Sequence, residues 1–381
     1  MEDSRFKEIK TLKKRDVPHK LHWFISEDYF SEELIGIYSS EVSTFYHIAK
    51  ETYELFEKAT QKIIADRRLD YLGIPSFFHK AIENSWNNRK DNPFFCGRFD
   101  INGGFDYKEA KVIEFNADTF STLPETIEWQ KLQLKELSGM KSQFNTLEDD
   151  LLSQMMELKS RIQFDDACFM ASSFGHQEDI ANCDVILDIA HKAGFNSYYA
   201  DLKDVTFSED DGILYQIGNE YQPVDVWFKV IPWDWMFTEE PNLAQSLAVI
   251  LEKKLATVLN PPYTAVWQNK KFLAYITEHF PNPYVAETYL QPQTGDYVEK
   301  PVYGRMGENI KVMTKDAASS KGDFSNQEKI YQKYYPLVTD RENYFYQLGM
   351  FYTNKPSAIN FRTQPTKIIT DDCEFMSHYI I

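Results

Sequence analysis

The chain has 381 residues, 43% of them hydrophobic and 15% aromatic, which is enough to bury a sizeable core in two or three interlocked domains. Its 58 acidic and 41 basic side chains leave a formal charge of -17, which disfavours nucleic acid and favours cationic small molecules as partners. The four cysteines share no C-x-x-C spacing, and neither a secretory signal nor an apolar run of roughly 18 residues is visible, so we expect a cytoplasmic protein without a membrane span.

The first quarter of the chain is predicted to be helical scaffold. Apolar residues recur at helical spacing from Ser31 to about Ala65, and Ser31 followed by Glu32 and Glu33 is typical of an N-cap and first helical turn. The aromatic stripe of this helix is expected to pack in the core. We therefore expect an N-terminal helical region over residues 1–90.

A β-hairpin and an α/β unit are predicted next. Strand-like segments flank a glycine-containing turn within 95–118, which favours a hairpin inside a segment of residues 91–140. The order helix, strand, helix, strand over residues 141–258 then indicates an α/β unit. Its first expected elements are helices at 145–162 and 178–195 and strands at 167–174 and 197–205.

The last third of the chain is α+β in character. Residues 242–258 predict a helix that ends before Asn260, Pro261 and Pro262, because consecutive prolines cannot continue a helix. The elements expected beyond it are a short helix at 269–280, two strands joined over a glycine turn within 297–312, and a strand at 344–351. The predicted fold class is therefore mixed, α+β with an α/β part.

The hairpin carries the densest group of candidate ligands. If it pairs about Tyr107, Asp100 lies opposite Glu114 and Arg98 lies opposite Asn116, all on one face. Facing carboxylates repel each other by up to about 1 kcal/mol, so a cation should compensate them. Magnesium suits two carboxylates and an amide oxygen, and Arg98 could clamp a phosphoryl group or a carboxylate. The alternative is a solvated sheet face that Arg98 and nearby lysines neutralise.

A second group of residues could hold phosphate. Lys270 begins a short helix, where the helix N-terminus adds partial positive charge. Lys300 ends a strand, and Arg305 lies between Gly304 and Gly307 in a turn that could cover phosphates. The alternative is that these are ordinary surface cations, since such short patterns occur often without a ligand.

Together these segments resemble the glutathionylspermidine synthase family of ATP-grasp carboxylate–amine ligases. GRFD, a turn and EFNADTFSTLPETIEWQ are similar to the family's metal-binding segment, and N-K-x-x-L and K-P-x-x-G-R-x-G-x-N-I to its ATP-binding segments. The resemblance runs from about Trp23 to the C-terminus and is to the form without an N-terminal amidase domain. It implies an ATP-grasp fold, with a preATP-grasp-like substrate domain over 141–258 and a nucleotide-binding region over 259–381.

The resemblance also implies a role for each matched residue. Magnesium would be bound by Asp100, Glu114 and Asn116. ATP would be contacted by Lys270, Lys300, Arg305 and Gln332.

Two arginines are implied to be catalytic. Arg98 would contact the phosphate and the acyl substrate, and Arg362 would stabilise the developing phosphate. Thr363 and Gln364, which follow Arg362, depart from the acidic or small residues usual in the family, and this puts the local contact in doubt. The substrate positions implied are Arg98, Thr119, Ser121, Glu178 and Asp179.

Some residues near the expected substrate cleft also have a structural interpretation. Acids such as Glu178 and Asp179 are common at a helix start for dipole reasons alone. Trp233 and Trp235 in VWFKVIPWDWMF, which resembles a family string near the substrate cleft, are expected to be core or cleft wall. No Ser/His/Asp or Cys/His order supports a hydrolase.

The implied function is an ATP- and magnesium-dependent ligase that forms an amide bond through an acyl phosphate. The acid would be a peptide or a glutathione-like molecule, and the amine a polyamine or another amine. The rival hypotheses are a catalytically silent nucleotide-binding module and a phosphotransferase. The identity of both substrates and the oligomeric state stay open.

Overall fold

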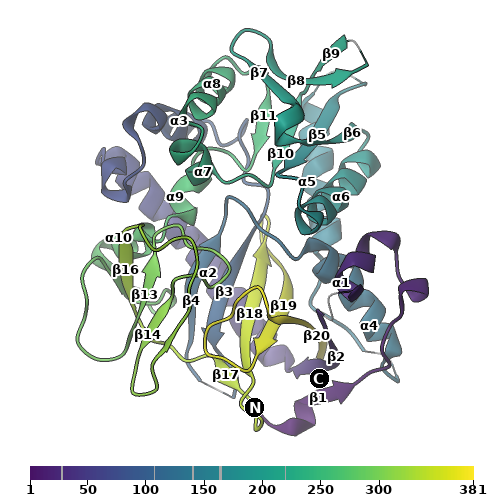
Figure 1. Ribbon diagram of the computed structural model, residues 1–381, viewed down its shortest axis with the longest axis vertical. Coiled ribbons are helices and arrows are strands. Elements are labelled where there is room, and N and C mark those ends of the chain that lie inside the picture. Colours follow the sequence, from purple (N-terminus) through teal and green to yellow (C-terminus); the bar gives the residue numbers. More distant parts are fainter. Residues whose placement is uncertain (27–28, 107, 140, 163–164, 219) are drawn as a thin grey trace.

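The fold comprises three regions (Figure 1): a large mixed sheet in the centre, a smaller antiparallel sheet beside it, and an α/β unit above both. Both chain termini lie at the lower end in this view. No helix within the described ranges combines the length and the apolar character needed to cross a membrane. The computed structural model describes residues 1–26, 29–106, 108–139, 141–162, 165–218 and 220–381.

The central sheet joins both ends of the chain to the predicted hairpin. Neighbouring strands are antiparallel except β2 and β20, which run parallel. Tyr107, the predicted centre of the hairpin, lies outside the described residues. In spatial order the strands are β1 (Phe6–Glu8), β2 (Phe30–Ile37), β20 (Glu374–Ile380), β19 (Pro356–Gln364), β18 (Phe345–Tyr352), β3 (Gly97–Gly103) and β4 (Ala110–Asn116), with β17 (Val338–Thr339) paired to β18.

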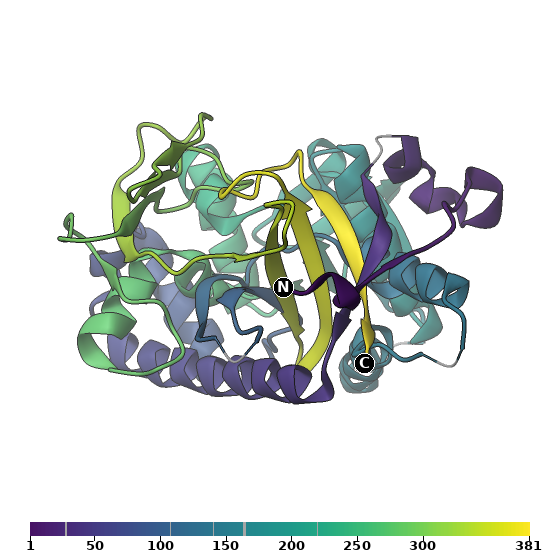
Figure 2. The same ribbon diagram turned by 90° about the horizontal axis from the view of Figure 1, so that it is seen from below.

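The long helix α2 (Ser39–Ala65) covers one face of this sheet, as Figure 2 shows from below. Phe45 and Phe56 of the helix are fully buried, which confirms that its aromatic stripe belongs to the core. Phe56 packs edge to face against Phe115 of β4 at a ring distance of 5.3 Å. The opposite face of the hairpin is left free for polar side chains.

The predicted start of this helix at Ser31 is wrong. Residues Phe30–Ile37 form strand β2, because they pair with β1 and, in parallel, with β20 from the far end of the chain. Such long-range pairing overrides a local helical pattern. The helix begins after Tyr38, whose backbone N–H donates to the carboxylate of Glu41 at 3.0 Å.

The α/β unit contains a four-stranded parallel sheet in the order β11 (Thr257–Leu259), β10 (Val226–Lys229), β5 (Cys168–Ser173) and β6 (Asn196–Asp201). The predicted strand–helix–strand order is confirmed. The predicted helix over 242–258 is too long, because it ends at Glu252 and Thr257–Leu259 instead add a buried edge strand. The helices of this unit are α5 (Leu147–Arg161), α6 (Gln177–Lys192), α7 (Trp233–Thr238) and α8 (Pro241–Glu252).

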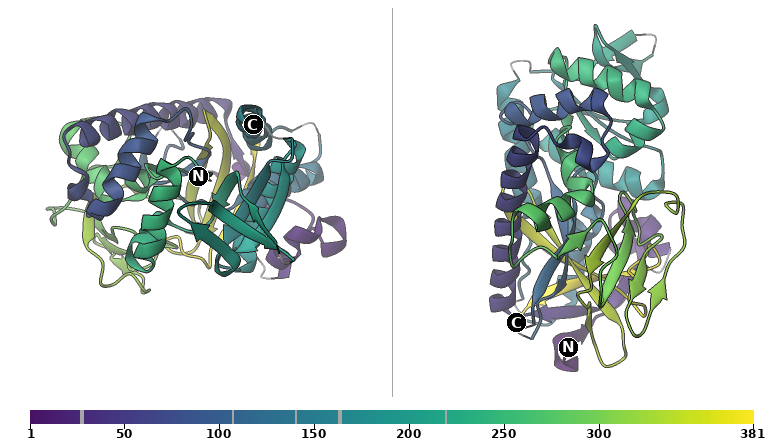
Figure 3. Two further views of the ribbon diagram at one scale, coloured as in Figure 1. Left: turned by 90° about the horizontal axis from the view of Figure 1, so that it is seen from above. Right: turned by 90° about the vertical axis from the view of Figure 1, so that its left-hand side faces the viewer.

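The smaller sheet contains the two strands predicted within 297–312, which pair antiparallel. In the right-hand view of Figure 3 it lies across the molecule from α2. Its strands, in spatial order, are β12 (Thr288–Tyr289), β16 (Lys329–Lys333), β13 (Tyr297–Pro301), β14 (Lys311–Met313) and β15 (Ala318–Ser319).

The remaining elements connect these regions. The central sheet takes strands from three of the four predicted segments, and the predicted domain limits stay predictions. The connecting elements are α1 (His22–Ser26), α3 (Ser76–Asn87), a π-helical turn (Glu125–Trp129), α4 (Gln130–Glu136), α9 (Thr264–Gln268), α10 (Lys271–His279) and the antiparallel sheet of β7 (Val205–Ser208), β8 (Gly212–Ile217) and β9 (Glu220–Pro223).

Candidate active site

A cavity of about 640 Å³ lies where the central sheet, the smaller sheet and the α/β unit meet. Every residue with a predicted site role lines it, although these residues come from segments as far apart as β3 and β19. The predicted residues brought together are Arg98, Asp100, Glu114, Asn116, Thr119, Ser121, Glu178, Asp179, Lys270, Lys300, Arg305, Gln332 and Arg362.

The hairpin has the predicted register at its polar positions. Arg98 pairs with Asn116 and Asp100 pairs with Glu114, so the two carboxylates do face each other. The register then shifts, which leaves Ile113 as an extra residue of β4. Ile113 lines the cavity as well, and nothing in the sequence marks this bulge.

Asp100 accepts hydrogen bonds from three side chains of the cavity. Its carboxylate accepts from Arg98 Nε at 3.0 Å, from Arg362 Nη2 at 2.7 Å and from Asn116 Nδ2 at 3.3 Å. Burial alone would raise the pKa of Asp100, but the charges of Arg362 and Arg98 hold that pKa below its ordinary value. Asp100 is therefore a fixed anion that orients both arginines.

Arg362 has a second acceptor, Gln347. Its Nη2 lies 2.7 Å from Oε1 of Gln347, which also lines the cavity. Burial works against the charge, but the Asp100 carboxylate raises the pKa of Arg362 above its ordinary value. Gln347 was not predicted as a site residue, although strand periodicity could have placed it on the cavity face of β18.

Gly349 makes room for this arrangement. It lies opposite Asp100 on β18, and a Cβ atom there would come within 2.8 Å of Arg98 Cδ and 2.3 Å of Asn360 Oδ1. No side chain fits at that distance. The glycine lets Arg98 lie flat on the neighbouring strand.

The lysines approach the hairpin from the smaller sheet and α10. Lys270 Nζ lies 3.0 Å from Glu114 Oε1 and donates to the carbonyl of Gly304 at 2.7 Å. Lys300 Nζ donates to Gln332 Oε1 at 2.9 Å. Burial lowers the pKa of Lys300 to about 8, with Glu114 opposing that shift and Lys270 adding to it.

The glycine-containing turn between β13 and β14 reaches across the cavity. Arg305 in this turn forms an ion pair with Asp234 of α7 in the α/β unit. Gly307 has a φ of 67°, and a Cβ atom there would meet the carbonyl oxygen of Ile369 at 2.2 Å. Asp234 lies in the string VWFKVIPWDWMF, but its pairing with Arg305 was not predicted from the sequence.

The α/β unit contributes an acidic wall at the start of α6. Burial raises the pKa of Glu178 and of Asp179, and for Glu178 the neighbouring Asp179 adds to the shift while Arg98 opposes it. Trp235 forms part of the cavity wall, whereas Trp233 is fully buried, as the sequence predicts for cleft wall and core. The wall favours a cationic group.

A buried ion pair fixes the end of the hairpin. Lys229 Nζ lies 2.5 Å from Asp118 Oδ1, and both side chains are almost completely buried. The other oxygen of Asp118 accepts the backbone N–H of Trp233 at 2.6 Å. Gln268 Oε1 accepts the backbone N–H groups of Ala117 and Asp118 at 3.0 and 3.1 Å. These contacts hold the loop after β4 against the α/β unit.

The donor set of the hairpin fits a magnesium ion. Asp100 and Glu114 offer carboxylate oxygens and Asn116 an amide oxygen, all hard ligands on one face. In the present arrangement Asn116 turns its Nδ2 toward Asp100, so coordination through its oxygen requires the amide to turn over. Arg98, Arg362 and Lys270 hold the two acids in place without filling the cavity.

Fold and site together define a protein of the ATP-grasp type. The chain belongs to the glutathionylspermidine synthase family: the family described as "Glutathionylspermidine synthase preATP-grasp" matches residues 10–381. A Haemophilus influenzae protein described as "Putative acid--amine ligase" is 26% identical over 318 residues, which are 79% of this chain and 78% of that protein. A glutathione synthetase-like effector from Globodera pallida, in apo form, shares the fold with a TM-score of 0.58 at 10% identity, over 95% of this chain and 96% of that one.

Proposed function

We propose that this protein is an ATP-dependent ligase that joins a carboxylate to an amine. The observation that carries the proposal is one cavity in which Asp100 orients two arginines beside two buried lysines. Its family and its Haemophilus influenzae relative support the acid–amine ligase class. The substrates we propose are a peptide or glutathione-like acid and a polyamine or another amine.

ATP would bind on the side of the smaller sheet. Lys270 and Lys300 would neutralise its phosphates, and the turn that carries Arg305 would cover them. Gln332, which would contact ATP, accepts from Lys300 and donates to the carbonyl of Ile113 at 3.2 Å, so it joins β16 of the smaller sheet to the hairpin.

Magnesium would be held by Asp100, Glu114 and Asn116, where it would supply positive charge next to the transferring phosphoryl group. Lys270 would exchange its contact with Glu114 for a phosphate oxygen when ATP binds.

In the first step an oxygen of the substrate carboxylate attacks the γ-phosphorus of ATP, the bond to the β-γ bridging oxygen breaks, and ADP leaves. Arg98 and Arg362 would hold the acyl substrate and the transferring phosphoryl group, and their orientation is fixed in advance by Asp100. In the second step the neutral amine nitrogen attacks the acyl carbon, the bond between that carbon and the phosphate oxygen breaks, and the leaving phosphate takes up the proton that the nitrogen loses.

The acidic wall is placed to receive the amine. Glu178 and Asp179 would bind an ammonium group, and Thr119 and Ser121 line the same cavity on the side of the acyl substrate. Because Glu178 lies near Arg98, an amine bound there would be close to the activated carbon of the acyl substrate.

ADP release measured across a panel of acids and amines tests this proposal. At least one acid–amine pair should stimulate ADP release, and Asp100→Ala with Glu114→Ala should abolish it while the protein stays folded. Glu220→Ala with Glu239→Ala removes two exposed acids outside the cavity and should leave turnover unchanged. Unchanged turnover in the Asp100/Glu114 variant would exclude the assigned site.

Hydroxylamine separates the ligase from its rivals. An acyl phosphate is trapped as a hydroxamate, whereas the phosphate ester made by a phosphotransferase is not. A silent nucleotide-binding module would bind ATP and release no ADP with any pair in the panel.

A further inference from the structure

The cavity of the candidate active site has a partly exposed apolar end on the side of the α/β unit. Phe174 and Trp235 line it, and their rings meet edge to face at a ring distance of 4.7 Å. Phe174 is 39% exposed although it forms part of a cavity wall. Val298 and Val312 form another apolar wall, on the smaller sheet where ATP would bind, so the nucleotide would leave the two rings uncovered.

The turn that carries Phe174 has a fixed backbone. It joins β5 to α6, and Ser173 Oγ accepts the backbone N–H of Gly175 at 3.2 Å and lies 2.9 Å from the hydroxyl of Tyr199. Gly175 has a φ of 85°, and a Cβ atom there would come within 2.6 Å of Asp201 Oδ1. The turn therefore presents the ring of Phe174 to the cavity in advance, and a ligand that covers this ring gains the free energy of apolar burial with little cost in ordering the protein.

Met306 adds a third apolar side chain to the same end of the cavity. Its chain neighbour Arg305 pairs with Asp234, the chain neighbour of Trp235, so this ion pair holds Met306 beside the α/β unit. Met306 is 55% exposed and lines the cavity, and its φ of 51° lies in a region that residues other than glycine rarely adopt. A flexible thioether next to aromatic rings adapts to the shape of an apolar ligand. Phe174, Trp235 and Met306 together form what we call the aromatic end of the cavity.

The acidic wall begins next to the aromatic end. Phe174 lies two residues before His176, the N-cap of α6, and Glu178 and Asp179 follow in the first turn of that helix. Four residues of fully extended chain span at most about 14 Å, so the Cα atoms of Phe174 and Glu178 are no farther apart than that. A cation bound by the acids therefore has an apolar surface within reach of a short carbon chain.

The two neighbouring features select between kinds of amine. A chain with several ammonium groups needs an acceptor for each of them, and the side chains of the aromatic end offer no charged acceptor. A bare alkyl chain covers little of a ring, whereas an aromatic group can pack edge to face or offset against both rings. One ammonium group joined to an aromatic ring by a short alkyl chain matches the acids and the rings together.

We propose that the aromatic end determines specificity and that the amine substrate is an arylalkylamine, a primary amine with an aromatic ring on a short alkyl chain. Its ammonium group would lie at Glu178 and Asp179, and its ring would pack against Phe174 and Trp235. This proposal rests on the proposed function, because it assigns the group at the aromatic end to the amine and not to the acid.

Calorimetric titration of the full chain with 2-phenylethylamine and with butylamine tests the proposal. Both molecules have one ammonium group, and only the first has a ring. Wild type should bind 2-phenylethylamine at least about tenfold more tightly than butylamine. Phe174→Ala should remove most of this preference and leave the affinity for butylamine unchanged, because it truncates a partly exposed ring. Trp235→Leu gives a second variant that should also lower the preference.

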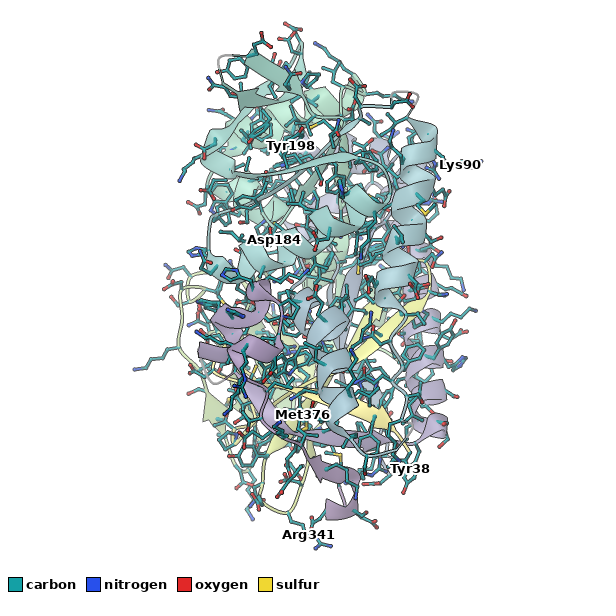
Figure 4. All side chains as sticks on the ribbon, turned by 90° about the vertical axis from the view of Figure 1, so that its right-hand side faces the viewer. Tyr38, Lys90, Asp184, Tyr198, Arg341 and Met376 are labelled. Atoms are coloured by element: carbon teal, nitrogen blue, oxygen red, sulfur yellow. The ribbon has the colours of Figure 1, made fainter. Side chains whose placement is uncertain are left out.

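The control variant removes a ring outside the cavity. Tyr198, labelled in Figure 4, lies on β6 of the same α/β unit, is 37% exposed and packs against the ring of Tyr215 at 5.7 Å. Tyr198→Ala should leave both affinities unchanged. Glu178→Gln with Asp179→Asn should weaken both amines alike and keep the preference for the ring.

Three results would overturn the proposal: binding of 2-phenylethylamine no tighter than that of butylamine in wild type, an equal loss of preference in Phe174→Ala and Tyr198→Ala, or a ring preference that depends on Phe174 for acids and not for amines. Titration with N-acetylphenylalanine and N-acetylalanine supplies the comparison for acids. ADP release separates this failure from failure of the proposed function. If the ring preference depends on Phe174 but no acid–amine pair releases ADP, the ligase reaction fails and the binding site stands. If other amines support ADP release and the two test amines bind equally, the reverse holds.

Discussion

The hairpin acids of the first cavity, that of the candidate active site, and the acids of a second pocket beside the central sheet differ in whether a cation of the protein pairs with them. In the first cavity Asp100 accepts from Arg98 and Arg362, and Glu114 pairs with Lys270. None of the acids that line the second pocket joins an ion pair of the described residues, and these acids are Glu32, Glu33, Asp340, Glu342 and Glu374. An acid with a cationic partner orients that cation for an anionic substrate, whereas an acid without one attracts a cation from solution. The acids behind the net charge of -17 thus include some that are paired with a cation of the protein and some that have no such partner.

We expect the largest effect, a loss of unfolding free energy, at a deeply buried acid that is paired with a cation. Lys229→Met leaves the Asp118 carboxylate without its cation, and breaking a buried pair in this way costs about 3–5 kcal/mol of unfolding free energy. Chemical denaturation measures this loss of unfolding free energy. Lys229→Met combined with Asp118→Asn should recover part of the loss, since no buried charge then remains. Equal stability of wild type and Lys229→Met would show that the pair contributes nothing.

Arg362→Met should come next, with turnover reduced about 10²- to 10³-fold, as for other groups that stabilise charge in a transition state. The measurement is the ADP release rate with saturating substrates. Arg362→Lys keeps the charge but loses the planar guanidinium whose Nη2 donates to both Asp100 and Gln347, so it should restore only a part of the turnover. Full activity in Arg362→Met would remove this arginine from the mechanism.

The site was more predictable from the sequence than the surrounding fold. The alternation of Arg98 and Asp100 against Glu114 and Asn116 fixes which side chains share a face, and the predicted pairs are confirmed. The bulge at Ile113 was not predictable, because it depends on how β4 fits its neighbours and leaves no mark in the residue types.

Errors arose where distant segments meet. Phe30–Ile37 has a local helical pattern, yet it pairs with β20 from the opposite end of the chain, and no local pattern reports such a partner. Thr257–Leu259 likewise leaves the preceding helix to pair with β10. The role of Asp234 was not predicted for the same reason, since its partner Arg305 is remote in the sequence, whereas strand periodicity could have placed Gln347 on the cavity face.

Glu125 breaks the simple contrast, because it is a fully buried acid that joins no ion pair among the described residues, although the charges of Glu178 and Arg98 act on it. Burial, with Glu178 adding to it, raises the pKa of Glu125 to about 8 from an ordinary value of 4.5. Between these two values the folded protein holds a proton that the unfolded chain has lost, so stability falls as pH rises through this range.

Glu125→Gln removes this titration and keeps the shape of the side chain. The variant should therefore be more stable than wild type above about pH 8, by an amount on the order of 2 kcal/mol, the cost of a buried charge without a partner. The difference should vanish near the ordinary pKa. Thermal unfolding across pH measures it, and Glu136→Gln, an exposed acid of α4, should show no such dependence. A pH-independent difference would assign Glu125 a role other than titration.

The smallest effect concerns Lys300, a cation of the first cavity that is only partly compensated. Its pKa is lowered to about 8, so the free protein loses this charge as pH rises through that value. Bound phosphate favours the charged form, and nucleotide affinity should therefore fall about tenfold for each pH unit above the pKa. Calorimetric titration with an ATP analogue between about pH 7 and about pH 9 checks the slope. Lys300→Arg stays charged throughout and should flatten the profile, whereas an unchanged slope in that variant would place the titrating group elsewhere.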